Sequence, residues 1–309
     1  MKDLKDTCRV AIVHAAPVLF NAAACTEKAV QLIKEAAKQG AELIVFPELF
    51  IPGYPFGLTF EYVVGSRGES GRADWKRYCD NSIVIPGPET EAIGQAAKEA
   101  GAFVSIGVSE RDAVNGTLYN ANVVFTPDGR LDALHRKLKP TGAERLVWGD
   151  ANKGYFPVTD SPWGPIGSLI CWESYMPLAR TALYQKGVSL YISCNTNDYD
   201  EWLCTVRHIA MEGRCYCINA DLFFTKDTYP RDLTAFSRAE IERLPEVICR
   251  GGSCVVDPRG QYVMEPVWDR EEIIVADLDM RKVSASRMEF DPVGHYARND
   301  VLELQVKDE

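Results

Sequence analysis

The sequence predicts an α/β fold in which helices flank mixed β-sheets. Amphipathic helical segments alternate with continuous apolar segments, an order typical of helices packed against buried strands. Short turn sequences connect further strands directly, which adds antiparallel pairs to the parallel ones. The 309 residues, of which 46% are apolar, suffice for one large domain or two ordinary ones. Because no linker or low-complexity tract divides the chain, we expect a single domain over residues 1–309.

A helix, a glycine and a buried strand follow one another three times along the chain. In the first occurrence the apolar residues of 27–38 share one face, Gly40 ends the helix and 43–46 form the strand. The later occurrences have the same order: residues 91–100, Gly101 and 103–108, then 178–186, Gly187 and 189–193. This repetition predicts a layered sheet with helices on its outside.

Three turn sequences predict β-hairpins. The strands expected around the turns are residues 107–112 with 117–125, 119–126 with 131–135, and 253–256 with 261–264. Residues 221–252 are the least regular stretch, polar and rich in turn residues. A segment of this length is usually a surface loop, and we expect it to act as a lid if it overhangs a functional site.

Charge and hydropathy exclude several classes of partner. The net charge of −10 and the isoelectric point near 5.1 argue against a nucleic acid or an anionic membrane, since no basic excess is present. The chain shows neither a signal-peptide core nor the roughly 18 consecutive apolar residues that span a bilayer. We therefore expect a cytoplasmic protein.

In a reducing compartment the ten cysteines are expected to be thiols rather than disulfides. Cys215 and Cys217 form an isolated pair and the four histidines are scattered, so the ligand spacing of a metal site is missing. We expect no metal and no organic cofactor.

Cys171 is the strongest candidate for a nucleophile. An apolar segment that begins at Gly167 ends on this thiol, and a helical pattern follows over 178–185. At such a strand-to-helix junction the backbone N–H groups and the helix dipole favour a thiolate. Active sites of α/β proteins gather at the carboxyl ends of strands. The alternative is a cysteine that only fills the core, as most buried thiols do.

Two further strands end in charged residues. Glu48 follows the apolar strand 43–46, and Lys137 ends the basic cluster that follows the strand 131–135. Taken alone, each charge is most often simply solvated. Together with Cys171 they can converge on one crevice, where the lysine offsets the cost of placing a thiolate beside a carboxylate.

The motifs Phe46-Pro47-Glu48, His135-Arg136-Lys137 and Cys171-Trp172-Glu173 resemble the Glu–Lys–Cys motifs of the nitrilase (carbon–nitrogen hydrolase) superfamily. The segment 135–149 resembles the lysine segment of its true nitrilase branch, and Trp-Glu after the cysteine is similar to nitrilases and cyanide hydratases. Further similar segments run in the family's order between Val10 and about Leu304: residues 53–55, 64–67, 207–214, 250–253 and 290–298.

The resemblance implies an αββα sandwich, with two mixed sheets between helices and the three residues at one rim. It assigns Cys171 as the nucleophile, Glu48 as general base and acid, and Lys137 as the cation beside the developing charge. Glu144 corresponds to the family's second glutamate, which positions the lysine or the substrate.

Several residues near these motifs are candidates for the substrate pocket. An aromatic residue in an apolar chain more often fills the core than lines a pocket, but ligand pockets are themselves mostly apolar. Both interpretations therefore stay open for Tyr54, Trp148, Trp172 and Trp202. Glu173 either holds neighbouring loops or simply begins a helix favourably. Asn195 belongs to the segment 193–198, which replaces an Ala-Pro-Thr-Ala-like strand end beside the family's pocket, so the usual substrate preferences do not transfer.

The function implied is that of a nitrilase, which converts organic nitriles and water to carboxylic acids and ammonia through a thioimidate and a thioester. The alternatives are an amidase or a cyanide or nitrile hydratase of the same superfamily, or a catalytically silent relative that serves as a binding or scaffold protein. The chain stops soon after Gln305, without the longer tail through which relatives build filaments. We expect a homodimer or another small homo-oligomer.

Overall fold

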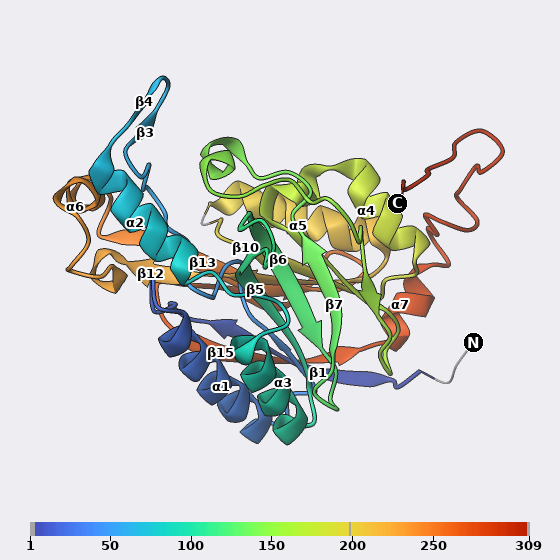
Figure 1. Ribbon diagram of the computed structural model, residues 1–309. Helices are drawn as coiled ribbons and strands as arrows, with labels where there is room; N and C mark the ends of the chain where they lie inside the picture. The colour runs from blue at the N-terminus through green and yellow to red at the C-terminus, as the bar shows by residue number, and fades with distance from the viewer. Residues whose placement is uncertain (1–3, 198, 308–309) are drawn as a thin grey trace.

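The computed structural model describes residues 4–197 and 199–307, and consists of two β-sheets packed face to face between layers of helices (Figure 1). The first sheet has six strands in the order β15-β1-β2-β5-β6-β7. Their bounds are β1 Thr7–His14, β2 Leu43–Val45, β5 Phe103–Arg111, β6 Leu118–Phe125, β7 Leu131–Arg136 and β15 Glu272–Asp279. The strands β1, β2 and β5 are parallel, while β6, β7 and β15 pair antiparallel to their neighbours.

The second sheet has seven strands, with β9, β10 and β11 parallel at its centre. Its path is β8-β9-β10-β11-β13-β12, and β14 pairs with β13. The bounds are β8 Val158–Thr159, β9 Ile166–Ile170, β10 Leu190–Asn195, β11 Tyr216–Asp221, β12 Phe223–Thr225, β13 Val247–Val256 and β14 Tyr262–Trp268.

Helices cover the outer face of each sheet. The first sheet packs against α1 (Ala22–Lys38) and α3 (Pro88–Ala100), and the second against α4 (Pro177–Gln185) and α5 (Asp200–Gly213). Buried apolar side chains from both sheets fill the layer between them, among them Val10, Leu43, Ile192 and Ile218. The predicted αββα sandwich of two mixed sheets is therefore confirmed.

The remaining helices and strands lie around this sandwich. They are β3 Tyr62–Val63, β4 Ser66–Arg67, α2 Glu69–Asp80, α6 Ala235–Glu242 and α7 Arg281–Ser286, with 3-10 turns η1 Gly142–Leu146, η2 Cys171–Tyr175 and η3 Lys226–Thr228. The hairpin of β3 and β4 projects from the body of the molecule (Figure 1). No helix in the described part of the chain combines the length and apolar character that crossing a bilayer demands.

All three predicted helix–glycine–strand units and all three hairpins are present. The first helix starts earlier than expected, at Ala22, because the Asn21 side chain accepts the Ala24 N–H and caps it. The added residues, 22–26, are three alanines, a cysteine and a threonine, which place no charged side chain on the outer face and so give only a weak amphipathic signal.

Residues 221–252 are more regular than expected. They contain β12, η3, α6 and the first half of β13. Hydrogen bonds connect the α6 region to α2 and to the segment before it. The Thr234 N–H, just before α6, donates to Asp74 of α2, and the Thr59 N–H donates to Glu240 of α6. The prediction that residues 221–252 are irregular was therefore wrong, while closure of this segment over a site stays a prediction.

The topology brings three strand ends together. The strands β2 and β7 run in the same direction, so the segments that follow them leave the first sheet at one edge. The strand β9 belongs to the facing sheet, and the Asn122 Nδ2 of β6 donates to the Ser168 Oγ of β9 at 3.0 Å. Glu48, Lys137 and Cys171 each follow one of these strands.

Candidate active site

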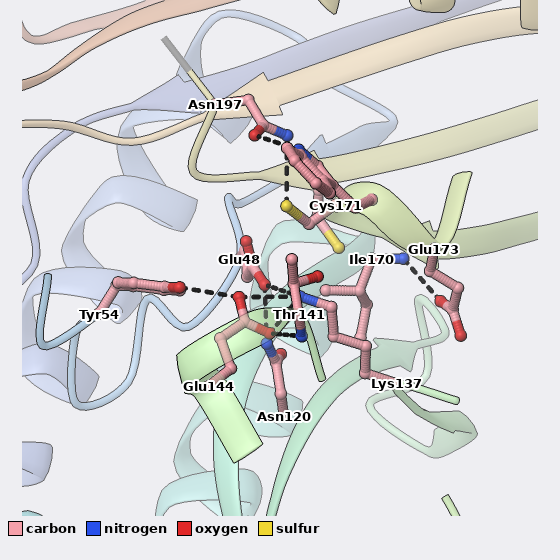
Figure 2. Close-up of polar contacts among 12 residues, drawn as sticks. Glu48, Tyr54, Asn120, Lys137, Thr141, Glu144, Ile170, Cys171, Glu173 and Asn197 are labelled. Atoms are coloured by element: carbon pink, nitrogen blue, oxygen red, sulfur yellow. Dashed lines mark hydrogen bonds and ion pairs between the residues drawn. The ribbon is translucent and has the colours of Figure 1, made fainter. Parts of the chain in front are cut away.

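A buried lysine lies at the centre of the site (Figure 2). The Lys137 Nζ donates to Glu48 Oε1 at 3.0 Å and to both carboxylate oxygens of Glu144, at 3.1 and 2.8 Å. The lysine is only 1% exposed, and a buried ammonium is stable only with such partners. Burial opposes its charge, but Glu48, the Cys171 sulfur and Glu144 outweigh burial and raise the pKa of Lys137.

Glu48 has one occupied and one free oxygen. Its Oε1 accepts from Asn120 Nδ2 at 2.7 Å as well as from Lys137. Its Oε2 is buried and has no hydrogen-bond partner among the described residues. Burial raises the pKa of Glu48, Lys137 acts against this shift and Glu144 adds to it. Glu48 is thus a carboxylate with a raised proton affinity and a vacant oxygen.

Glu144 is held in place by its own turn and by Tyr54. It lies in η1, where its Oε2 accepts the Thr141 N–H at 2.6 Å. Its Oε1 accepts from the Tyr54 hydroxyl at 2.7 Å. The Tyr54 ring lies against Trp148, with 5.8 Å between ring centroids. In the structure Tyr54 therefore contacts Glu144, which in turn holds Lys137, and Trp148 packs against Tyr54.

Cys171 is the first residue of η2, directly after β9. Its φ is 54°, in the left-handed region that non-glycine residues rarely adopt. Figure 2 shows its side chain beside Glu48 and Lys137. The Asn197 Nδ2 donates to its Sγ at 3.2 Å. The predicted convergence of carboxylate, ammonium and thiol is present in the structure.

The electrostatics of the thiol differ from the expectation. Burial raises the pKa of Cys171 far above its usual range and Glu48 raises it further, while Lys137 and the Trp172 backbone N–H act in the opposite direction. The helix α4 begins only at Pro177, beyond η2, so no long helix dipole starts at the thiol. Cys171 therefore rests as a thiol rather than a thiolate.

Glu173 connects the segment that carries Lys137 with the segment that carries Cys171. Its Oε1 accepts the Leu138 N–H at 2.7 Å, and its Oε2 accepts the Ile170 N–H at 2.9 Å and lies 2.8 Å from His135 Nε2. The carboxylate thus ties the chain on both sides of Lys137 to the residue before Cys171. Its oxygens are occupied by the protein, which fits the loop-holding alternative rather than direct substrate binding.

The other predicted pocket residues fall into two groups. Trp202 and Asn195 are buried, and the Trp202 Nε1 and the Asn195 Nδ2 both donate to Asn219 Oδ1, at 3.0 and 2.7 Å. Trp172 is half-exposed and lines a cavity of about 320 Å³ beside the site. Other residues around this cavity are Thr141, Gly142, Arg145, Glu173 and Met176. Asp198, at the end of the segment 193–198, lies outside the described residues.

Three residues of the site were missed by the sequence analysis. Asn120 is one of two asparagines within the buried strand β6, and only its contact with Glu48 distinguishes it. Asn197 lies in the unusual segment 193–198, whose sequence was itself a signal. Gly107 lies under the Glu48 backbone, where an added Cβ would be 2.4 Å from the Pro47 oxygen and 2.7 Å from the Glu48 Cα.

These residues together define a class of protein. A thiol beside a carboxylate with a free oxygen, next to a buried ammonium, is suited to an enzyme that attacks its substrate through sulfur and moves protons through the carboxylate. Within the part of the chain that the structure describes, no group of three or more His, Cys, Asp or Glu residues is arranged to hold a metal ion.

Comparison with known proteins gives the family. The carbon–nitrogen hydrolase family model matches residues 9–288. An aliphatic nitrilase of Sinorhizobium fredii is 46% identical over 301 residues, covering 97% of this chain and 96% of the relative. The bifunctional nitrilase/nitrile hydratase NIT4B of Nicotiana tabacum is 39% identical, covering 98% and 86%. The chain belongs to the carbon–nitrogen hydrolase family and, within it, to the nitrilases.

Solved structures agree with the fold. Saccharomyces cerevisiae Nit3, a member of branch 10 of the nitrilase superfamily, superimposes with a TM-score of 0.73 at 22% identity, covering 96% of this chain and 98% of that one. The carbon–nitrogen hydrolase of Helicobacter pylori G27 gives a TM-score of 0.73 at 18% identity, with 95% and 96% coverage. At these identities the likeness concerns the fold alone.

Gly107→Ala should displace Glu48. The new methyl group meets backbone atoms of residues 47–49, so we expect turnover to fall about a hundredfold through misplacement of the base and the free energy of unfolding to fall by about 1–3 kcal/mol. Gly149→Ala is the control, because its Cβ meets the Thr117 and Tyr119 side chains first, at 3.1 and 3.5 Å. Steady-state kinetics and urea unfolding measure both effects. Unchanged turnover in Gly107→Ala would refute the role given to this close approach.

Glu173→Gln should lower kcat with little change in KM. The amide places an N–H group against one of the backbone N–H groups that the carboxylate now accepts, which costs about 1–3 kcal/mol of stability and loosens the turns that carry Lys137 and Cys171. Kinetics on a nitrile and urea unfolding test this. A raised KM at unchanged kcat would instead assign Glu173 to substrate binding.

Proposed function

We propose that this enzyme hydrolyses organic nitriles to carboxylic acids and ammonia, with Cys171 as nucleophile. The observation that carries the proposal is the unpartnered Glu48 Oε2 in the same buried cluster as the Lys137 ammonium and beside the Cys171 thiol. The similarity over nearly the whole chain to a relative named aliphatic nitrilase supports the substrate class.

The first step is addition of sulfur to the nitrile carbon. Because the thiol rests protonated, its proton passes to Glu48 as the carbon–sulfur bond forms. The nitrile nitrogen gains negative charge and takes that proton back from Glu48, which gives a thioimidate. The Lys137 ammonium stabilises the negative charge during this transfer, since it is buried and keeps its proton.

The second step is hydrolysis of the thioimidate. Glu48 removes a proton from water as the water oxygen adds to carbon and passes it to the nitrogen, so the tetrahedral intermediate carries sulfur, hydroxyl and amino groups. The hydroxyl proton then passes through Glu48 to the amino group, the carbon–nitrogen bond breaks, and ammonia leaves a thioester behind. A second water molecule hydrolyses the thioester to the carboxylic acid and restores the thiol, so that one nitrile consumes two water molecules.

Glu144 and Tyr54 support this chemistry without exchanging a proton. Burial raises the pKa of Tyr54 well above its ordinary value, and Glu144 and Glu48 raise it further, so its hydroxyl remains a donor to Glu144. Glu144 in turn orients the Lys137 ammonium. We propose that the nitrile reaches Cys171 from the cavity beside Trp172.

The proposal includes a cytoplasmic location and a small homo-oligomeric state. All ten cysteines are free thiols, which supports the reducing environment of the cytoplasm. Exposed apolar side chains gather at the start of α4, where Tyr175, Met176 and Leu178 are 43%, 40% and 66% exposed. Such a patch supports a homodimer or another small homo-oligomer.

The test is mass spectrometry of the protein mixed with an aliphatic nitrile, an aromatic nitrile and an arylacetonitrile. We expect a covalent adduct on Cys171 with at least one of them, together with acid and ammonia in equal amounts. Cys171→Ala should form neither adduct nor product while unfolding like the wild type. An adduct on a different cysteine, or turnover of amides but no nitrile, would contradict the proposal.

A further inference from the structure

The Cys171 sulfur has a hydrogen-bond donor that the mechanism above does not use. Asn197 follows β10, and its Nδ2 donates to Cys171 Sγ at 3.2 Å. Both residues are buried, with exposures of 6% each. Figure 2 shows the Asn197 side chain on the side of the sulfur away from Lys137. The sulfur therefore lies between the proton-transferring cluster and a neutral amide.

The contacts of Asn197 determine which end of its amide faces the sulfur. The Trp172 Nε1 donates to Asn197 Oδ1 at 3.2 Å. A flipped amide would place its NH₂ group against that indole N–H, losing the hydrogen bond from Trp172, and would present an acceptor instead of a donor to the sulfur. The Asn197 backbone N–H donates to Asp221 Oδ1 at 3.0 Å, which holds the residue itself in place. The donor is thus directed at the sulfur by the protein.

A donor at the sulfur acts wherever sulfur gains negative charge. Hydrogen bonds to charged groups are stronger than those between neutral groups, so this contact strengthens when the carbon–sulfur bond is breaking. In the tetrahedral intermediate, loss of ammonia and loss of sulfur compete. Stabilisation of the departing sulfur favours the second pathway.

We propose that Asn197 is a catalytic residue that stabilises the Cys171 sulfur as a leaving group and so directs part of the tetrahedral intermediate to amide. This inference rests on the proposed function. In the amide branch the carbon–sulfur bond breaks and its electron pair goes to sulfur. The hydroxyl oxygen becomes the carbonyl oxygen, and its proton passes through Glu48 to sulfur. One nitrile and one water molecule thus give one amide, and the thiol is restored without an oxidant or a second substrate.

The assignment is specific to Asn197 among the asparagines of this strand end. The Asn195 Nδ2 donates to Ser193 and Asn219, and among the described residues no hydrogen bond joins its side chain to Cys171. Tyr199 touches the same network from outside, since its hydroxyl accepts from Trp172 Nε1 at 2.7 Å. A change at Tyr199 therefore perturbs the neighbourhood but leaves the donor to sulfur in place.

The experiment measures initial rates of amide and acid release for the nitrile that the wild type turns over fastest. Wild type should release both products. Asn197→Ala should lower the amide-to-acid ratio about tenfold, the effect of losing one hydrogen bond to a charged group. Asn197→Asp keeps the size of the side chain and the acceptor for Trp172, and should lower the ratio as well. Tyr199→Phe is the control and should keep the wild-type ratio.

A second measurement does not need nitrile turnover. Alkylation of Cys171 by iodoacetamide as a function of pH should shift to higher pH in Asn197→Ala, because the thiolate loses its donor. The proposal is overturned by wild type that releases acid without amide, by an unchanged ratio in Asn197→Ala and Asn197→Asp, or by an unchanged alkylation profile. Absence of any nitrile turnover in the wild type would refute the proposed function separately, while the alkylation profile would still decide whether the donor acts on the sulfur.

Discussion

The site depends on one buried ammonium placed between two carboxylates. Glu48 and Glu144 could not both stay charged in the interior without Lys137, which donates to each. With Lys137 in place the cluster keeps a net negative charge, and this charge together with burial keeps the neighbouring thiol protonated. In the mechanism we propose, Cys171 is therefore activated during attack on the substrate rather than stored as a thiolate. The close backbone approach at Gly107, the Asn120 amide and the Tyr54 hydroxyl all serve to hold this cluster.

Much of the fold could be predicted because its signals are local. The amphipathic stretch 27–38, the glycines after each helix and the Asn115-Gly116 turn determine structure within a few residues of themselves. In residues 221–252 the local signal is weaker, limited to the Thr234 side chain that accepts the Ser237 N–H at the start of α6. This helix is stabilised by distant partners, since Glu240 accepts from Thr59 and Asp74 accepts from Thr234, and contacts of that range cannot be inferred from one sequence.

The residues of the site also divide into those that a local sequence pattern marks and those that only the tertiary structure reveals. Glu48 and Cys171 could be found because each is a reactive residue at the end of an apolar strand, and Lys137 because it ends a basic cluster after a predicted strand. Asn120 and Gly107 could not, because their importance lies in which strand passes beside them, while Asn197 was marked only by the unusual sequence of its segment, 193–198. The thiol illustrates the limit most clearly. Its sequence neighbourhood suggests a helix end that lowers the pKa, whereas burial and Glu48, which are tertiary effects, raise it.

The central claim is that Lys137 compensates two buried carboxylates, and unfolding of charge-deletion variants tests it most directly. Lys137→Met alone should lower the free energy of unfolding by about 3–5 kcal/mol, because it leaves uncompensated buried charge. The triple variant Glu48→Gln, Lys137→Met, Glu144→Gln should regain most of that loss and remain inactive. A Lys137→Met protein as stable as the wild type, or a triple variant no more stable than Lys137→Met, would contradict the account.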